Sequence, residues 1–244
     1  MKTKNFAINT LWVLLLSLAT SCNMLPDEPL FDAPVTPEEV GGTYNGHDYV
    51  DLGLPSGLMW AAYNVGASKP EEYGGYYAWG ETEEKENYTW STYKWCNGSY
   101  DTMTKYCTNS SYGTVDNKTT LDLEDDVAHV EWGGSWRMPT KAEQDELRNN
   151  CTWQWTTQNG VKGYKVTSKT NGNSIFLPAA GYRYATDLND IGKGDYWSSS
   201  LYEGHSDNAY DLYFGSADKY FGSGYYNWYQ DYRYNGYSVR PVSK

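Results

Sequence analysis

The 244-residue sequence predicts an α+β domain with many short strands, one or two short helices and a high loop content. From residue 47 onward, short apolar segments alternate with Gly, Asn and Pro turns, as they do in antiparallel β-rich proteins. One clear helix start, Thr140 followed three residues later by Glu143, interrupts this pattern. Aromatic residues make up 17% of the chain, so we expect a core of Trp, Tyr and Phe with few aliphatic side chains.

The first 21 residues are organised as an export signal. Two lysines precede an apolar run, Leu11–Leu18, that is too short to span a bilayer, and small residues then lead to Cys22. The stretch ATSC resembles a bacterial lipobox, in which the cysteine thiol is acylated and becomes the mature N-terminus. The alternative is an ordinary secretory signal with an incidental cysteine. We expect residues 1–21 to be removed and Cys22 to carry lipid.

Residues 22–45 combine prolines with acidic residues and show little apolar periodicity, which predicts an extended tether. Asp27-Glu28 resembles the acidic export signal of surface lipoproteins in bacteroidetes. The formal net charge of −12 argues against nucleic acid as a partner and against direct attraction to anionic lipid. These features indicate an outer-membrane lipoprotein whose folded, monomeric domain, residues 46–244, faces outward.

The first half of this domain is expected to be rich in strands and loops. Tyr49–Leu52 and Leu58–Ala62 are predicted strands around a Pro-Ser-Gly turn, and residues 72–81 are a further aromatic strand. Residues 81–120 lack a helical period and are predicted to be a long loop. A short helix is expected within residues 121–134, ending at the Gly133-Gly134 pair.

The second half begins with the main helix. The capping box places this helix at about Lys141–Asn149, with Ala142 and Leu147 among its few inward residues. Four segments with strand character follow, separated by Asn and Gly turns: residues 160–168, 174–183, 195–200 and 209–216.

Three cysteines follow Cys22 in the sequence. Cys96 and Cys107 are close enough in sequence to close a short disulfide loop in an oxidising compartment, or to remain unpaired. An odd number leaves at least one thiol free, and we expect this to be a buried Cys151.

The sequence offers little support for an enzyme. His47, His129 and His205 are isolated, and Ser198-Ser199-Ser200 has no base nearby in sequence. The acidic cluster Asp122, Glu124, Asp125 and Asp126 is a candidate Ca²⁺ site, but it lacks EF-hand spacing, and helix N-terminal carboxylates are the alternative explanation. We therefore expect no catalytic residue, no metal and no cofactor.

Six segments carry a family resemblance. In chain order they resemble the major paralogous domain of fibrobacters and bacteroidetes, over about residues 47–242: YVDLGLPSGLMWAAYNVGA, EYGGYYAWGE, WGGSWRMPTKAEQDEL, SIFLPAAGYR, YWSSSL and GYSVRPV. WRMPTKAEQDEL is also similar to a segment of formylglycine-generating enzymes and of retroelement-diversified variable proteins. The resemblance implies a C-type lectin-like fold. Tyr63 stands where the family often has Cys, and the catalytic cysteines of formylglycine-generating enzymes have no counterpart, so neither a disulfide at that position nor that activity carries over.

The C-terminal part of the domain contains the candidate binding surface. Within residues 208–214, alternation places Tyr210, Leu212 and Phe214 toward the core and Ala209, Asp211 and Tyr213 outward. The following Tyr, Gly, Ser and Asn residues have the composition of antibody binding loops, although tyrosines that pack into an aromatic core are the alternative. The predicted ligand-binding residues are Tyr202, His205, Asp207, Asp211, Tyr213, Tyr220, Tyr225, Tyr226, Trp228, Tyr229, Asp231 and Tyr232.

The composition of this region also suggests how it arose. From Tyr202 to Tyr237, 26 of 36 residues are Tyr, Asn, Asp, His, Ser or Gly, all of which arise by changing adenines of an Asn codon. Retroelement-diversified proteins vary in this way. The leading hypothesis is therefore a surface lipoprotein that binds a protein or glycan, and diversification by a retroelement is part of this hypothesis. The alternatives are a pilus or fimbrial tip subunit and, less favoured, a formylglycine-generating-type enzyme.

Overall fold

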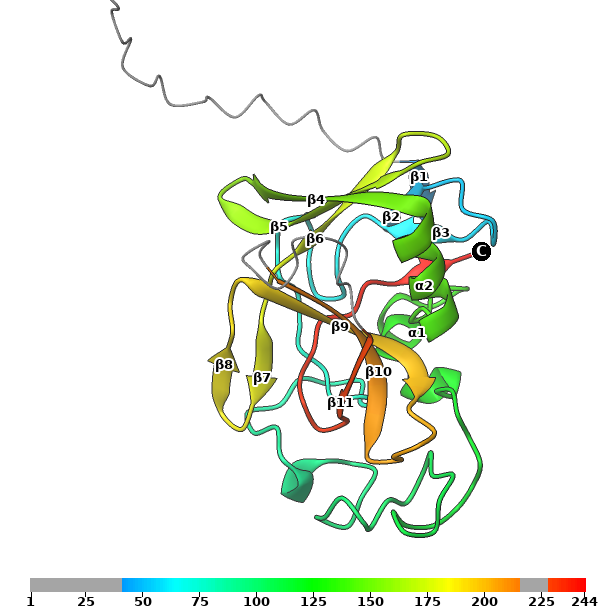
Figure 1. Cartoon of the computed structure of the whole chain (residues 1–244), viewed down its shortest axis with the longest axis vertical. Coiled ribbons are helices and arrows are strands. Elements are labelled where there is room, and N and C mark those ends of the chain that lie inside the picture. The colour runs from blue at the N-terminus through cyan, green and yellow to red at the C-terminus, as the bar shows by residue number, and fades with distance from the viewer. Residues whose placement is uncertain (1–40, 216–227) are drawn as a thin grey trace, which may run out of the picture. The chain divides into compact units, whose positions relative to one another are not determined.

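A computed structural model describes residues 41–215 and 228–244 (Figure 1). The signal segment, Cys22 and most of the tether lie outside the described residues, as do Tyr220, Tyr225 and Tyr226 of the predicted binding loop. The described chain is α+β, with antiparallel sheets and few short helices, as the sequence predicts. None of its helices is both long enough and apolar enough to span a membrane.

The two ends of the domain meet in one antiparallel sheet. Its strand order is β1 (Gly42–Tyr44), β2 (His47–Asp51), β3 (Met59–Ala61) and β12 (Val242–Ser243). The predicted turn between β2 and β3 is present, with the Gly57 N–H donating to the Leu54 carbonyl at 2.8 Å. Gly57 has φ 70°, a left-handed backbone conformation that favours glycine.

Three further antiparallel units complete the fold. A meander contains β4 (Cys151–Gln158), β5 (Val161–Ser168) and β6 (Ser174–Pro178), and a hairpin contains β7 (Tyr182–Tyr184) and β8 (Asp187–Asn189). The third sheet places β10 (Asn208–Gly215) between β9 (Lys193–Leu201) and β11 (Trp228–Tyr232). β1, β4, β8, β11 and β12 were not anticipated, and β7 overlaps the end of the strand predicted at residues 174–183. In β4 the signal was present, since Cys151, Trp153 and Trp155 alternate with polar residues.

The main helix forms where the capping box predicts it. α2 spans Lys141–Asn150, the Glu143 N–H donates to Thr140 Oγ1, and the Glu143 carboxylate accepts from the Thr140 N–H. Arg137 also donates to both oxygens of that carboxylate. The prediction that Ala142 points inward is wrong, since it is exposed, whereas Leu147 is buried as expected. Gln144 is buried instead, because its amide donates to two β9 carbonyls.

The shorter helical elements follow the acidic segment. η2 (Leu123–Asp125) leads into α1 (Val127–Trp132), which ends at Gly133 as predicted. The Asp126 side chain caps α1 by accepting from the N–H groups of Ala128 and His129. This cap agrees with the helix N-terminal explanation for that carboxylate.

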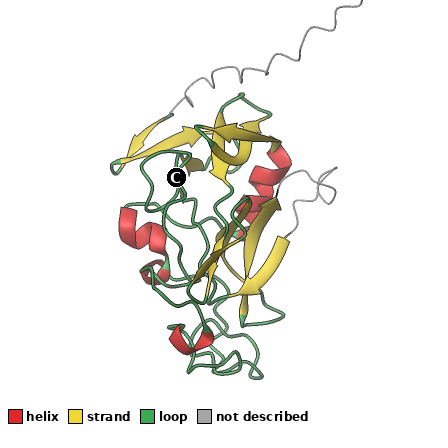
Figure 2. Ribbon diagram, turned by 90° about the vertical axis from the view of Figure 1, so that its left-hand side faces the viewer, coloured by secondary structure: helices red, strands yellow, loops and turns green. Residues whose placement is uncertain are grey.

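The long loop is largely as predicted. Residues 81–120 contain only the single-turn η1 (Trp90–Thr92) and isolated bridges, and they occupy the end of the domain opposite β4 and β5 (Figures 1 and 2). The strand predicted at residues 72–81 is wrong. That segment makes one isolated bridge, Tyr77 with Tyr237, while Trp79 is buried and its backbone N–H donates to the Arg233 carbonyl.

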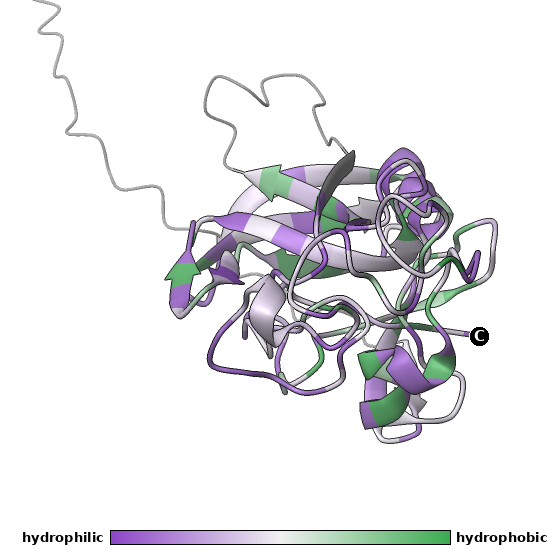
Figure 3. Cartoon of the chain, turned by 90° about the horizontal axis from the view of Figure 1, so that it is seen from below, coloured by the Kyte–Doolittle hydropathy of each residue, from purple (hydrophilic) through white to green (hydrophobic). Residues whose placement is uncertain are grey.

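The core is rich in aromatic residues and contains two buried arginines. Large buried rings include Trp60, Trp79, Trp136 and Trp197. Arg240 donates to the carbonyls of Ala61, Ala62 and Phe176 and to the Asn64 side chain, and Arg233 donates to Tyr93, Lys105, Tyr106 and Ser206. Figure 3 shows hydrophobic positions interspersed among hydrophilic ones on the strands and helices.

All three cysteines among the described residues are buried and free. The Cys96 thiol donates to the Trp90 carbonyl and the Cys107 thiol to the Asn109 carbonyl, each at 3.2 Å. The structure therefore has no Cys96–Cys107 disulfide. Cys151 is buried as expected, and burial raises the pKa of its thiol to about 11.

Candidate functional site

The candidate site lies on one face of the β9–β10–β11 sheet. On the opposite face, Leu212 and Phe214 of β10 pack into the core with Tyr196 of β9. The register places Tyr213 opposite Asp195 and Asp211 opposite Trp197. Because neighbours across a ladder share a face, Asp195, Asp211 and Tyr213 lie on the same side of the sheet.

The predicted outward position of Asp211 is wrong, because this face is covered. Asp211 and Ala209 are 0% exposed, and Tyr210, predicted to be core, is only half-buried. The β9–β10 register shifts between Ala209 and Asp211, whereas β10 pairs with β11 residue by residue from Asn208 to Leu212. Above this face, the ring of Tyr237 stacks on Trp197 with centroids 4.2 Å apart, and Tyr182 of β7 packs against Tyr237 at 5.8 Å.

Beside the covered face lies a half-open cavity of about 200 Å³. The cavity brings together three strands of the sheet, the β7–β8 hairpin and the C-terminal segment, so residues far apart in sequence become neighbours (Figure 1). Its lining is entirely Tyr and Asp: Tyr182, Asp190, Asp195, Asp211, Tyr213, Asp231 and Tyr237. We call this group the acidic cavity.

The carboxyl groups of the acidic cavity differ in their hydrogen bonding. Asp231 accepts from the Tyr237 hydroxyl and from the Tyr232 N–H. By contrast, both carboxylate oxygens of Asp211 and Oδ2 of Asp195 are buried and have no hydrogen-bond partner among the described residues. Asp190 pairs with Lys193 at 2.7 Å, near the surface. The two most deeply buried carboxyls are therefore the ones that lack donors.

This environment favours the protonated form of the inner carboxyls. Burial, followed by the nearby negative charges of Asp231 and Asp190, raises the pKa of Asp195 to about 7. Burial, followed by Asp195 and Asp231, raises the pKa of Asp211 well above its ordinary value. Burial also raises the pKa of Asp231. The cavity thus holds acceptors whose negative charge lacks compensation.

The remaining predicted residues lie in separate places. Tyr202, His205 and Asp207 are at the β9–β10 turn, where the rings of Tyr202 and His205 stack and His205 contacts the Tyr112 hydroxyl. Six strand positions separate Asp207 from Tyr213, which corresponds to about 20 Å. The predicted rim position of Asp207 is wrong, since it is only 6% exposed beneath the turn.

Tyr232 marks a third location. It is 43% exposed, and its ring contacts Trp90 and Tyr234 rather than the acidic cavity. Of the predicted residues whose side chains the structure describes, Asp211, Tyr213 and Asp231 are brought together. The side chains of Trp228 and Tyr229 lie outside the described residues, although their backbone belongs to β11.

Sequence reasoning missed Asp195, Tyr182, Asp190 and Tyr237. Alternation within KGDYWSSSL was a usable signal for Asp195, because it places Asp195 and Trp197 on the face opposite Tyr196. No local signal relates the β7–β8 hairpin or Tyr237 to this sheet. Their approach depends on how distant segments pack.

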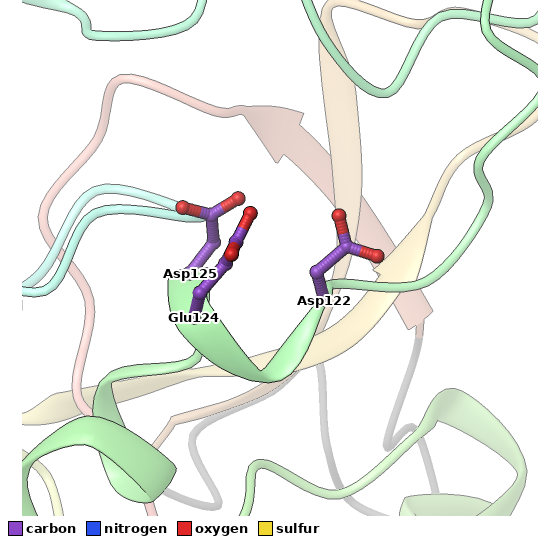
Figure 4. A group of neighbouring side chains, drawn as sticks. All are labelled: Asp122, Glu124 and Asp125. Atoms are coloured by element: carbon purple, nitrogen blue, oxygen red, sulfur yellow. The ribbon is translucent and has the colours of Figure 1, made fainter.

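The second acidic cluster is an ion-pair network. Asp122, Glu124 and Asp125 lie close together on and beside η2 (Figure 4). Lys105 contacts all three carboxylates, at 2.7, 3.2 and 2.6 Å respectively. Hydrogen bonds to these acidic groups raise the pKa of Lys105 against the opposing effect of its burial. The lysine supplies the positive charge that a metal ion would otherwise provide.

The hydroxyl and imidazole groups considered for catalysis have structural partners. Ser198 donates to the Tyr210 carbonyl, and Ser200 accepts from the Lys141 N–H. His47 stacks on Trp132 with ring centroids 3.9 Å apart, and His129 Nδ1 lies 3.2 Å from the Trp136 carbonyl. These contacts account for the residues without invoking a reaction.

A larger hollow of about 580 Å³ lies beside β7, lined by Glu84, Lys85, Glu86, Tyr88, Arg183 and Thr186. Its charges are of both signs, and Lys85 already pairs with Glu81 at 2.8 Å. It therefore offers weaker evidence of a ligand than the acidic cavity does. In comparisons with protein-family models, curated proteins and solved structures, nothing matches this chain.

Proposed function

We propose that this protein is a cell-surface lipoprotein with a C-type lectin-like domain that binds a protein or glycan ligand beside β10. The export-signal pattern and the six-segment resemblance support the location and the fold. The mixed α+β architecture of the described residues is compatible with that fold.

The observation that carries the proposal is the lining of the acidic cavity. Its tyrosines provide rigid aromatic area, and its carboxyl groups provide hydrogen-bond acceptors without a described donor. Recognition sites commonly combine aromatic contact area with a few polar groups that orient the ligand. A sequence selected only for stability would gain by replacing buried, unpaired carboxyls with apolar groups. Their presence in a cavity favours a role in binding.

Diversification by a retroelement remains part of the proposal, but burial limits the positions at which residues can vary. Ser206, Asp207, Asp211, Asn235 and Tyr237 all have adenine-accessible identities and are all buried. Free exchange at buried positions would destabilise the fold. If copies of this region vary, we expect variation at exposed positions such as His205 and Tyr232. A near-repeat in the encoding genome that differs only at adenines would test this.

The binding proposal is tested by screening glycans and cell-surface proteins with the full chain in nonionic detergent. We expect a specific ligand whose binding is weakened by Tyr213→Ala, because Tyr213 lines the cavity. Tyr184→Ala is the matched control, since Tyr184 is exposed at 48% and lies outside the cavity. Equal loss in both variants would contradict the site. Concentration-dependent self-assembly without ligand binding would favour a pilus or tip subunit instead.

A further inference from the structure

Within the described part of the chain, neither inner carboxyl of the acidic cavity forms an ion pair. Asp211 is 0% and Asp195 4% exposed, and three of their four oxygens have no hydrogen-bond donor in the described structure. Lys193, whose charge acts on Asp195, is paired with Asp190, and its side chain is 43% exposed. An arrangement of this kind is complete only when protons or a positively charged group occupy it.

We propose that the acidic cavity binds an organic cation, namely an ammonium or guanidinium group at the end of the ligand. The proposal rests on the proposed binding function and specifies its chemistry. Asp211 and Asp195 accept hydrogen bonds from the cation, and Asp231 contributes negative charge at the edge. The rings of Tyr182 and Tyr237, whose centroids are 5.8 Å apart, provide aromatic surface beside the cation.

The spacing of the carboxyls favours an organic cation over a metal ion. Ca²⁺ requires about six to eight oxygens at roughly 2.3–2.6 Å, so its ligands converge on one point. Among the described residues, the one group of three ligand atoms within 4.8 Å of one another is Asp122, Glu124 and Asp125, outside this cavity. A guanidinium has five N–H donors spread over a plane, and an ammonium has three, so either can reach carboxylates that do not converge.

The size of the cavity sets the size of the group. A volume of about 200 Å³ is smaller than the roughly 300–1,000 Å³ of pockets that hold drug-sized ligands. It matches a side-chain-sized head group, such as the end of a Lys or Arg side chain or of a free alkyl amine. The net charge of −12 also favours the approach of cations.

Binding of a cation is expected to be coupled to proton release. Among the side chains that the structure describes, the titratable and charged groups facing the inner carboxyls are Lys193 on β9, Tyr213 on β10, Asp231 on β11, Asp190 before β9, Tyr182 on β7 and Tyr237. Burial and mutual repulsion hold protons on Asp195 and Asp211, and a bound cation favours their ionised forms. Binding should therefore strengthen as the pH rises.

The test measures binding of N-acetyl-arginine amide and of its neutral analogue N-acetyl-citrulline amide to the full chain by calorimetry. At about pH 8 we expect the arginine probe to bind at least about tenfold more tightly than the citrulline probe. We expect Asp211→Asn to remove this preference, while Asp187→Asn, an exposed aspartate on β8, keeps it. Binding should weaken toward about pH 5.5.

A further probe, butylguanidinium, distinguishes recognition of the head group alone from recognition of a protein side chain. If butylguanidinium binds as well as the arginine probe, the head group alone is recognised; if only the arginine probe binds, a protein side chain is the natural occupant. Both results support the proposal. Equal binding of arginine and citrulline probes, no binding of either, or an unaltered preference in Asp211→Asn would overturn it. A screened ligand that Tyr213→Ala loses and Asp211→Asn retains would overturn the cation inference while keeping the proposed function.

Discussion

Asp195 and Asp211 lower the stability of the folded chain whenever they are ionised, because burial separates them from water and no described donor reaches three of their four oxygens. The pKa of Asp195 rises from an ordinary 3.8 to about 7 in the folded state. Between these two values the folded chain binds more protons than the unfolded chain. The stability that this group contributes is present at low pH and is lost as the pH rises through about 7.

The first prediction concerns this pH dependence. We expect a higher melting temperature at about pH 5 than at about pH 8, because Asp195 and Asp211 are protonated at the lower pH. Burial also raises the pKa of Asp126 to about 6, which acts in the same direction. The variant Asp211→Asn should melt higher than the parent at about pH 8 and show a smaller pH difference.

The control for this experiment is Asp187→Asn, which alters an exposed carboxyl and should leave the pH difference unchanged. Thermal unfolding followed by circular dichroism measures both quantities. A melting temperature that falls in Asp211→Asn at about pH 8 would show that the carboxylate has a stabilising partner and would contradict the description of the cavity.

The tyrosines near the C-terminus have two distinct roles. Tyr237 is 1% exposed, its ring stacks on Trp197 and its hydroxyl donates a hydrogen bond to Asp231, whereas Tyr232 is 43% exposed. We expect Tyr237→Ala to lower the free energy of unfolding by about 3–5 kcal/mol, as Phe214→Ala should, since each removes a buried ring. Tyr232→Ala should cost less than about 1 kcal/mol. Urea unfolding checks the contrast, and comparable losses at Tyr232 and Tyr237 would refute it.

At the scale of the element, α2 is defined mainly by its N-terminus. Its sequence is polar, and only Gln144 and Leu147 are buried, so packing alone gives the helix a weak boundary. Thr140 and Glu143 cap it reciprocally, and Arg137 fixes the Glu143 carboxylate. The Arg137 charge and the hydrogen bonds from Arg137 and Thr140 hold the pKa of Glu143 below its ordinary value despite burial.

The N-terminal cap of α2 leads to a prediction about stability. Thr140→Ala should lower the free energy of unfolding by about 1 kcal/mol, because it removes the hydroxyl that accepts from the Glu143 N–H. Thr114→Ala, at an exposed loop position, is the matched control and should change little. Urea titration measures both variants. Identical unfolding midpoints for the two would show that the cap contributes nothing.

β10 shows how an element's two faces acquire different roles. Leu212 and Phe214 pack with Tyr196 in the core, while Asp211 and Tyr213 line the acidic cavity. Alternation assigns the core face correctly at Leu212 and Phe214. The expected exposure of Ala209 fails because Ala209 belongs to one buried cluster with Trp197 and Tyr237. Tyr210 is half-buried rather than in the core.

At the scale of the whole molecule, the proposed location depends on Cys22. If this residue is acylated, the Cys22→Ala variant should be released from membranes or fail to mature. Ser17→Ala, a conservative change within the same signal segment, should leave membrane association intact. Fractionation of cells with immunodetection of the chain distinguishes the two. Unchanged membrane partitioning of Cys22→Ala would contradict the lipoprotein assignment.

The sequence by itself determined the α+β class, the capped helix α2, the β2–β3 pair, the end of α1 at Gly133 and the long loop. These features depend on neighbouring residues: a cap, a turn or a short alternating run acts over a few positions, so the local sequence contains the necessary information. The aromatic core was likewise predictable, because little aliphatic surface is present to replace it.

Only the tertiary structure decided which residues form the candidate site. Asp195, Asp211 and Asp231 come from three strands, and Tyr182 and Tyr237 from two other segments, so no local pattern links them. Burial of Asp211 depends on the segment that covers its face, and a polar residue in an alternating strand is expected to be exposed unless something packs above it. The acidic cavity thus arises from long-range packing, which assembles carboxyl groups that the sequence keeps apart.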